Sequence, residues 1–530
     1  MASDEGTPVA RQLVKAKAVW ETRNHWNRYI QNAYDYALPH RQNVGKTSTF
    51  DIDKLTDMTA PMGAMYFAGN LQKDLFPAAS SKFTYEAGPL LQNELKAREL
   101  IVLEKEYQGI ANRVDPFFQS GDFDTSANEA CMDLGIGTGA IMPVHGDKHQ
   151  PLFFANVPFE NLACKGDLWG RLTYISWKQR LTIEEIHYGF RDTGRFSDAF
   201  MEQLKSKPND ELEIYQDFWK TAHGWIWVAY TEKYCTEFII EARTRTQPIA
   251  VMRYFRGPGE PYGRGPILLG MPTIMTLNKA QELALRSAAV QLLGIWGYRT
   301  GGTFNPDTAH MGPGEFWPMM STGGQFGPDV QRLDPATANF NIARVVIDGM
   351  RDDIKGLLLD NRLEQKGLTP PSASQIVASL QDRADANIGA FGRLSRESMP
   401  VLAPRATEIL YEQGYIQSPV QLNELLVTTK VRSPMQQALD ARKLEASVTY
   451  FDMVTAIAGP QNSDEHIKAD EVLADARKVL DIDHRLAPSN EERQSIRQQK
   501  QQQIAVATAA EYALEAAKIP QDQQAQGAIA

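Results

Sequence analysis

Residues 271–366 constrain this chain most, because they read as two long helices separated by a segment that cannot be helical. The first helix is predicted over 273–298, directly after Pro272, and proline is tolerated at a helix start. The second helix is predicted over 339–366. Residues 300–337 between them are crowded with glycine and proline, which favours short strands and turns. The sequence therefore predicts a helical hairpin with a small irregular head.

The two predicted helices differ in how their apolar residues are distributed. The second half of the first helix is apolar almost all round, so it must pack against neighbours on several sides. At 100° per residue, the cations of the second helix fall within roughly 60° of its circumference, opposite an apolar side. The cations are Arg344, Arg351, Lys355, Arg362 and Lys366, and the apolar residues are Ile342, Val346, Met350, Ile354 and Leu357. A lone hairpin cannot cover both apolar flanks, so other domains or other copies are required.

Composition narrows the class of protein. A chain of 530 residues holds roughly three or four domains, and its net charge of −10 argues against a protein that binds nucleic acid by broad neutralisation of phosphates. A protein that lets nucleic acid pass remains open. Cys131, Cys164 and Cys235 are too few for a disulfide framework, so we expect core thiols in a reducing compartment. The polar N-terminus carries no secretory signal, and the longest weakly polar run, 288–298, is too short to span a membrane.

The order of local patterns predicts an α+β protein that is mainly helical. Helical spacing is found over residues 10–38, 60–75, 93–114 and 124–134. Short runs of aromatic and β-branched residues then predict strands. These runs are 141–144, 153–157, 172–177, 212–219, 225–230, 237–241 and 249–254. Helices resume with a capping box at Ser372 and Gln375 and a break near Pro400 and Pro404, and the C-terminal hundred residues are predicted to be mostly helical.

No motif for catalysis, cofactor binding or metal binding withstands inspection. Gly45-Lys46-Thr47 ends like a phosphate-binding loop, but His40 stands where that loop needs its first glycine. The glycines of 135–139 follow a helix and precede a strand, which is the reverse of the order in a dinucleotide site. No histidine pair has metal-ligand spacing, and Asp464-Glu465-His466 is more simply a solvated helix start. We therefore expect no enzymatic activity and no cofactor.

The cations of the second hairpin helix have two interpretations. They can form a solvated face, with Asp348 and Asp352 pairing to Arg351 and Lys355 at helical spacing. Alternatively, the row of cations can face a polyanion. The pattern alone leaves both interpretations open.

Several stretches, in order along nearly the whole chain, carry a resemblance to a known family. They are 23–39, 60–77, 253–256 followed by Gly-Glu-Pro-Tyr-Gly-Arg at 259–264, 387–404 and 431–458. The chain resembles the portal, or head-to-tail connector, proteins of short-tailed, podovirus-type bacteriophages. One departure is Gln375, where relatives often carry glutamate, which weakens any salt bridge assigned to that point.

The resemblance implies a ring, usually of twelve subunits, around a channel for double-stranded DNA at one capsid vertex of the virion. The protein would be made in the cytoplasm of a host bacterium. The implied parts are a wing over 1–268, stem helices over 269–299 and 338–366, a clip over 300–337, a tunnel loop over 367–371, a long wing helix with its connection over 372–430, and a crown with a helical tail over 431–530.

The resemblance also assigns candidate residues and partners. The residues predicted to face DNA in the stem and tunnel loop are Arg344, Arg351, Lys355, Arg362, Lys366 and Thr369. The clip is predicted to offer a contact surface through Phe304, Phe316, Trp317 and Phe326. The implied partners are further copies of the chain, the DNA, terminase, the tail adaptor, the major capsid protein and scaffolding or internal core proteins. One alternative is a non-viral multidomain scaffold or binding protein. Another is an NTP-dependent packaging enzyme, although the missing phosphate-binding loop argues against it.

Overall fold

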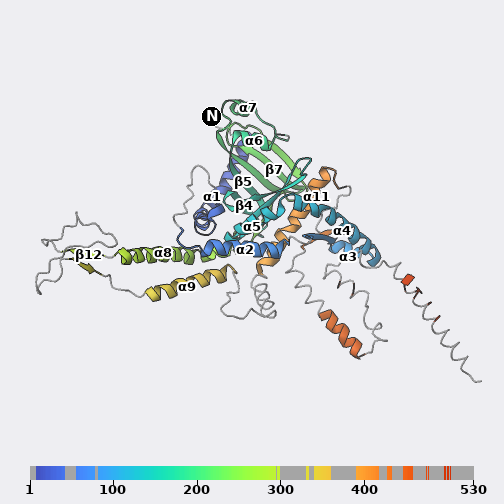
Figure 1. Cartoon of the computed structure of the whole chain (residues 1–530). Helices are drawn as coiled ribbons and strands as arrows, with labels where there is room; N and C mark the ends of the chain where they lie inside the picture. The colour runs from blue at the N-terminus through green and yellow to red at the C-terminus, as the bar shows by residue number, and fades with distance from the viewer. Residues whose placement is uncertain are drawn as a thin grey trace, which may run out of the picture. The chain divides into compact units, whose positions relative to one another are not determined.

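The computed structural model describes residues 7–41, 55–77, 81–191, 193–293, 295–298, 330–333, 340–359, 389–416, 426–431 and 446–457, together with single positions further on. The chain divides into two compact units, Met1–Met435 and Gln436–Ala530. In the second unit, residues 446–457 are helical. The first unit mixes helices and strands, as the sequence predicts, and holds every other element described here (Figure 1). The wing, stem, clip, tunnel-loop and crown boundaries stay predictions.

The first helix, α1 (Pro8–Ala37), begins where its sequence says it should. The Thr7 hydroxyl accepts a hydrogen bond from the Ala10 amide at 3.2 Å, and Pro8 occupies the first helical turn. The helix ends at Ala37, before the short 3-10 turn η1 (Pro39–Arg41), which confirms the predicted end near Pro39.

An antiparallel sheet of five strands follows the chain order from β4 to β8. Its strands are β4 (Leu162–Gly166), β5 (Leu172–Thr182), β6 (Glu211–Thr221), β7 (Gly224–Thr231) and β8 (Ile240–Thr244). Neighbouring residues of β6 point to opposite faces, since Ile214 packs with α6 (Ile183–Gly189) and α7 (Asp198–Ser206), whereas Tyr215 packs with α1. Helices therefore cover parts of both faces of this sheet (Figure 1).

A second core joins helices to a three-stranded antiparallel sheet in the order β3, β2, β9. The strands are β2 (Thr138–His145), β3 (Leu152–Val157) and β9 (Ala250–Arg253), and the helices are α2 (Thr59–Leu75), α4 (Ala97–Ser120), α5 (Phe123–Ile136) and α11 (Met399–Glu412). The fully buried rings of Phe118, Phe123 and Phe154 meet at its centre, with centroids 4.7 to 5.1 Å apart.

Two further strand pairings complete this unit, one between distant segments and one local. Strand β1 (Phe83–Ala87) pairs with β14 (Val427–Val431), so residues far apart in the chain form one ladder. Strands β10 (Phe255–Arg256) and β11 (Gly263–Arg264) form a short ladder before the hairpin, and the short helix α3 (Pro89–Glu94) follows β1. The predicted break near Pro400 is confirmed, because the helical residues 389–397 end at a bend and α11 starts at Met399.

The hairpin is present, with one correction to its first helix. Helix α8 (Pro266–Leu293) begins earlier than the predicted 273–298, and Pro272 lies inside it. The predicted end of this helix is wrong, because β12 (Ile295–Tyr298) is a strand paired with β13 (Val330–Leu333). The aromatic and β-branched residues of β12 favour a strand, and β13 provides the partner strand that the sequence pattern of 295–298 alone does not reveal. Helix α9 (Phe340–Leu357) lies beside α8 and begins near its predicted start (Figure 1). Its predicted end at 366 is wrong, because the helix stops at Leu357 and residues 358–359 form a turn in which Leu359 adopts φ +56°.

Within the part of the chain that the structure describes, no helix combines the length and apolar character needed to cross a membrane.

Candidate functional site on the hairpin helices

Helix α9 packs on the rest of the first unit through a narrow face. Ile347, Ile354 and Leu358 are buried and follow one another at spacings of seven and four, which places them on one side of a helix. They belong to the same core cluster as Ile274 and Leu277 of α8. Val346 and Leu357, which the sequence analysis placed on the apolar side of the helix, are 49% and 38% exposed. Compared with the predicted apolar side, the buried face of α9 is therefore rotated toward the cations. The cause of this rotation is a contact with a residue outside α9.

That contact is an ion pair at the base of the hairpin. The Arg351 guanidinium donates to Asp57 Oδ2 through Nε at 2.9 Å and through Nη2 at 2.8 Å. Asp57 is buried, whereas the Arg351 side chain is 32% exposed. Asp57 Oδ1 accepts from the Thr59 amide at 2.8 Å at the start of α2. The Asp57 carboxylate thus contacts two helices, α2 through the Thr59 backbone amide and α9 through the Arg351 side chain.

A single asparagine of α8 completes this junction. Asn278 Oδ1 accepts hydrogen bonds from the backbone amides of Thr56 and Asp57, both at 3.1 Å. The Thr56 hydroxyl donates to the Asn278 carbonyl at 2.6 Å, and Asn278 Nδ2 donates to the Ile274 carbonyl at 3.0 Å. We call Thr56, Asp57, Asn278 and Arg351 the hairpin junction. It ties α2, α8 and α9 together at one point.

Electrostatics at the junction favour the charged forms of both partners. Burial by itself would raise the pKa of Asp57, but the hydrogen bonds from Thr59 and Arg351 outweigh burial and hold the pKa below its usual value. The hydrogen bond to Asp57 raises the pKa of Arg351. The pair is therefore ionised at neutral pH.

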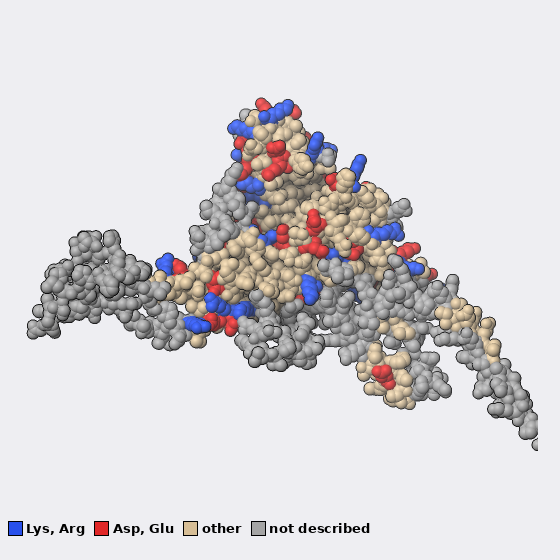
Figure 2. All heavy atoms as spheres, in the orientation of Figure 1, with Lys and Arg blue, Asp and Glu red and all other residues tan. Residues whose placement is uncertain are grey.

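The other described cations of the predicted DNA-facing set have different surroundings. Arg344 has an 84% exposed side chain and lies 3.8 Å from Asp348. Lys355 lies 3.7 Å from Asp352, and Arg351 also reaches Asp348 at 3.3 Å. The expected pairing within the helix is confirmed, and Figure 2 shows basic and acidic side chains interspersed on the face of the molecule that it presents. Arg362, Lys366 and Thr369 lie outside the described residues.

The outer side of α8 combines ion pairs with uncovered apolar residues. Glu282 accepts from Lys279 at 2.8 Å and from Arg286 at 2.6 Å. Leu283 and Leu285, close by on the same helix, are 54% and 55% exposed. About half of each leucine side chain is thus accessible, and residues two apart on a helix point in different directions, so the two leucines leave apolar surface on two sides of α8.

The head of the hairpin is closed by a ladder that sequence analysis missed. Ile295 pairs with Leu333 and Tyr298 pairs with Val330, so the two ends of 299–329 are brought together. The run of aromatic and β-branched residues at 295–298 was the available signal, but it also suited the end of a helix. The predicted contact residues Phe304, Phe316, Trp317 and Phe326 lie outside the described residues.

The described residues contain no cluster of three or more His, Cys, Asp or Glu that could hold a metal ion. Cys131 and Cys164 are buried as expected, and burial raises the pKa of the Cys164 thiol to about 12, so it is not a ready nucleophile. Cys235 is partly exposed. The glycines of 135–139 lie at the turn from α5 into β2, which confirms the order of helix and strand that argued against a dinucleotide site. Gly45-Lys46-Thr47 and Asp464-Glu465-His466 lie outside the described residues.

Comparison with known proteins gives one extended match. Residues 11–487 match the model of a family described as bacteriophage head to tail connecting protein. No curated protein sequence matches the chain.

Two solved structures are similar at 10% identity. A chain of the virion of a native gene transfer agent particle aligns with a TM-score of 0.35, covering 75% of this chain and 88% of that chain. A chain of the neck of an empty gene transfer agent particle aligns with a TM-score of 0.36, covering 82% of this chain and 92% of that chain.

Proposed function

Since this chain belongs to the family of bacteriophage head to tail connecting proteins, we propose that it is the portal of a short-tailed bacteriophage. In this role it forms a ring at one capsid vertex of the virion, and double-stranded DNA enters and leaves the capsid through the ring. The observation that carries the proposal is the extent of the family match, since residues 11–487 include the hairpin and the regions on both sides of it.

A ring of twelve subunits accounts for the surfaces that a single copy leaves uncovered. Leu283 and Leu285 of α8 and Val346 of α9 are exposed on helices that already bury another face. Contacts that repeat head to tail around an axis cover such faces and close without leaving a free edge. Helices α8 and α9 correspond to the stem in this arrangement, and 300–337 and 367–371 correspond to the clip and the tunnel loop.

The exposed cations of the stem can make weak, repeated contacts with DNA. Arg344 is the best placed of those described, because its side chain is 84% exposed and its partner Asp348 is 3.8 Å away. Exposed contacts of this kind are screened by salt and individually weak. With a net charge of −10 per copy, the ring would not grip phosphates tightly, which suits passage of DNA rather than retention.

The clip is the proposed docking surface for terminase during packaging and for the tail adaptor afterwards. The ladder of β12 and β13 offers a place to test this, because 299–329 can be exchanged for a short Gly/Ser linker between two paired strands. We expect that variant to keep the fold of the first unit and to lose attachment of terminase and tail. Infectious particles assembled from it at normal yield would contradict the assignment. Major capsid and scaffolding or internal core proteins are the proposed partners elsewhere on the ring.

We propose further that the protein is not an enzyme and acts as an assembly platform and conduit. A purified chain that hydrolyses ATP with turnover would favour an NTP-dependent packaging enzyme instead.

Electron microscopy of the purified chain tests the proposal most directly. We expect rings with a central hole, and class averages along the axis would count the subunits. The molecular mass of the same sample should be measured to establish that it contains a single stable species. If that species shows no central hole, the result would favour a non-viral scaffold or binding protein.

A further inference from the structure

The turn between β4 and β5 holds two large apolar side chains in water. Leu168 is 92% exposed and Trp169 is 73% exposed. Neither residue has a role in the hairpin or in the cores of the first unit. We call residues 167–170 the Trp169 turn.

The Trp169 turn is held rigidly although its tip is exposed. Asp167 Oδ1 accepts from the Arg171 amide at 2.7 Å and Oδ2 accepts from Arg171 Nε at 3.0 Å. The Gly170 amide donates to the Asp167 carbonyl at 2.9 Å, and Gly170 adopts φ +78°, which favours glycine. The turn is therefore fixed by its own hydrogen bonds.

Two arginines from outside the sheet anchor the turn further. The Gly170 carbonyl accepts from Arg253 Nη1 at 3.0 Å and from Arg256 Nη1 at 2.8 Å. Arg253 is itself fixed by Glu397, whose carboxylate accepts from the Arg253 amide at 2.9 Å and from Nε at 3.0 Å. A rigid backbone that presents tryptophan loses little conformational entropy on binding, which is typical of residues that dominate protein interfaces.

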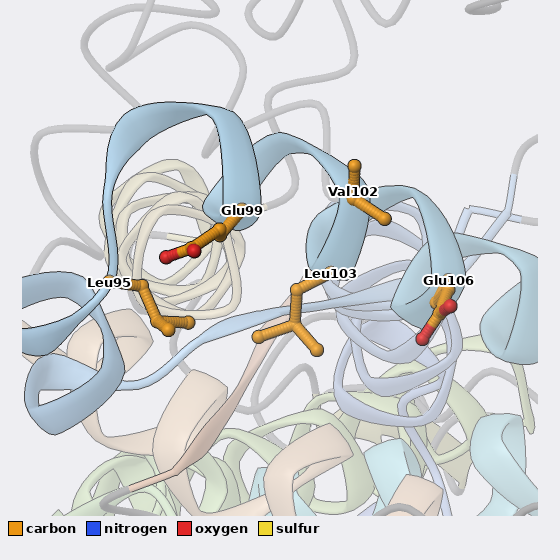
Figure 3. A pocket seen from close by; sticks show the side chains of 5 residues that line it. All are labelled: Leu95, Glu99, Val102, Leu103 and Glu106. Carbon is orange, nitrogen blue, oxygen red and sulfur yellow. The ribbon is translucent and has the colours of Figure 1, made fainter.

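A complementary groove lies on α4 of the same chain. It has a volume of about 480 Å³ and is lined by Leu95, Glu99, Val102, Leu103 and Glu106. Figure 3 shows Leu95, from the connection before α4, and Leu103 of α4 directed toward the same space, with Glu99, Val102 and Glu106 around it. Val102 is 60% exposed. We call these five residues the α4 groove.

The charges beside the two features are opposite. Lys165 and Arg171 flank the Trp169 turn and are exposed, and Arg171 pairs with Asp167 of the turn, so these three residues together carry a net charge of +1. The described residues that line the α4 groove include two carboxylates, Glu99 and Glu106. An apolar tip with a net positive charge beside it complements an apolar groove that is bordered by carboxylates.

We propose that the Trp169 turn of one copy inserts Leu168 and Trp169 into the α4 groove of a second copy. The Trp169 turn and the α4 groove do not bury each other within one molecule, because Leu168, Trp169 and Val102 all remain exposed in the single chain. The contact joins two different surfaces, so it is head to tail, and repetition around an axis closes a ring. This inference rests on the ring of the proposed function and names one contact that holds it together.

Cysteine cross-linking tests the contact in the full-length chain. Leu168→Cys in one preparation and Val102→Cys in another are mixed before assembly, both in a Cys235→Ser background that removes the partly exposed native thiol. We expect a disulfide-linked dimer on non-reducing gels, and a ladder of higher oligomers from the chain that carries both substitutions. The matched control replaces Leu168→Cys with Tyr188→Cys, an equally accessible residue that is 78% exposed, and should give no dimer above background. Trp169→Ala in the double-cysteine chain should lower the cross-linked fraction, because losing a dominant interface residue weakens the affinity of the contact by about thirtyfold.

The outcomes separate this contact from the ring itself. Rings seen by microscopy without the cross-link between positions 168 and 102 would overturn the contact and leave the portal proposal standing. The cross-link without rings would support the contact and overturn the ring. Equal cross-linking of position 102 to positions 168 and 188 would mean random collision and would overturn the contact. Cross-linking of position 168 only to another virion protein would do the same.

Discussion

At the scale of single residues, Asp57 organises the base of the hairpin. Its Oδ1 atom accepts from the Thr59 amide at the start of α2, and its Oδ2 atom binds Arg351 of α9. Its backbone amide is bound by Asn278 of α8. A buried carboxylate is costly unless it is paired and hydrogen-bonded, and here every described interaction of the carboxylate supports the placement of a helix.

The first prediction compares the two carboxylates that contact Arg351. Asp57→Ala should lower the local stability of the hairpin base by about 1–3 kcal/mol, because it removes charge-assisted hydrogen bonds, and the lower half of this range reflects the partial exposure of Arg351. Asp348→Ala removes an exposed partner and should change stability by less than about 0.5 kcal/mol. Hydrogen–deuterium exchange of peptides from α9 measures both. Equal protection in the two variants would argue that Asp57 does not hold the hairpin.

The second prediction follows from the pKa of Asp57, which is lower in the folded chain than in a free side chain. A depressed pKa means that the ionised form stabilises the fold above the unfolded pKa of about 3.9, and that this stabilisation disappears as the pH falls through the folded value. Wild-type protein should therefore melt at a higher temperature than Asp57→Asn at pH 7, and the gap should shrink below about pH 4. A gap that is constant from pH 7 to pH 3 would contradict the assignment.

At the scale of elements, the C-terminal end of α9 packs closely against α2 at Gly63. A methyl group added at Gly63 would meet Leu358 Cδ1 at 2.6 Å, and Leu358 is fully buried. Gly349 and Gly356 of α9 form a second narrow strip, but no described atom lies within 4 Å of a methyl group at either. The close approaches to this end of α9 are therefore made by glycines of its neighbours, Gly63 of α2 and also Gly270 of α8, where an added methyl group would meet Leu357 Cδ2 at 2.5 Å.

The third prediction uses a second glycine of α2 as its control. Gly63→Ala forces Leu358 to move in a packed site, which should cost about 1–3 kcal/mol. Gly69→Ala on the same helix meets nothing within 4 Å and should stabilise the helix by up to about 1 kcal/mol, since alanine is the better helix former. Both changes reduce the freedom of the unfolded chain alike, so the difference in thermal unfolding isolates the contact. A difference near zero would mean that Leu358 finds another rotamer without loss.

At the scale of the whole molecule, the hairpin cations divide into a structural residue and candidates for contact with DNA. Arg351 is bound to Asp57, so reversing its charge would damage the fold as well as any channel. Arg344 and Lys355 each lie near a carboxylate of their own helix, at 3.8 Å and 3.7 Å. A test of the channel must therefore spare Arg351.

The fourth prediction applies this division. The double variant Arg344→Glu with Lys355→Glu should still form rings but lower the amount of DNA packaged or retained per particle, because negative side chains would repel phosphates along the bore. Arg351→Glu alone should lower the melting temperature of the chain before any effect on DNA. Quantification of DNA in purified particles, with ring images of the same preparation, gives the comparison. Rings lost in the double variant would instead place these residues in a seam between subunits, and normal packaging would remove them from both roles.

Much of the fold was accessible from the sequence because it depends on residues within one or two turns of each other. The break near Pro400, which lies in the first turn of α11, and the order of helices, strands and hairpin are local signals, and the structure confirms them. The pairs of Arg351 with Asp348 and of Lys355 with Asp352 are also local, since residues three apart are neighbours on a helix.

Only the tertiary structure decided which side of α9 is buried and what Arg351 does. Asp57 lies 294 positions from Arg351, and no periodicity links residues at that separation. The same holds for β12, whose sequence suits a helix end or a strand until β13 supplies the partner ladder. Local patterns report the preferences of a segment in isolation, whereas the choice between two acceptable states depends on the free energy of contacts that exist only after the chain has folded.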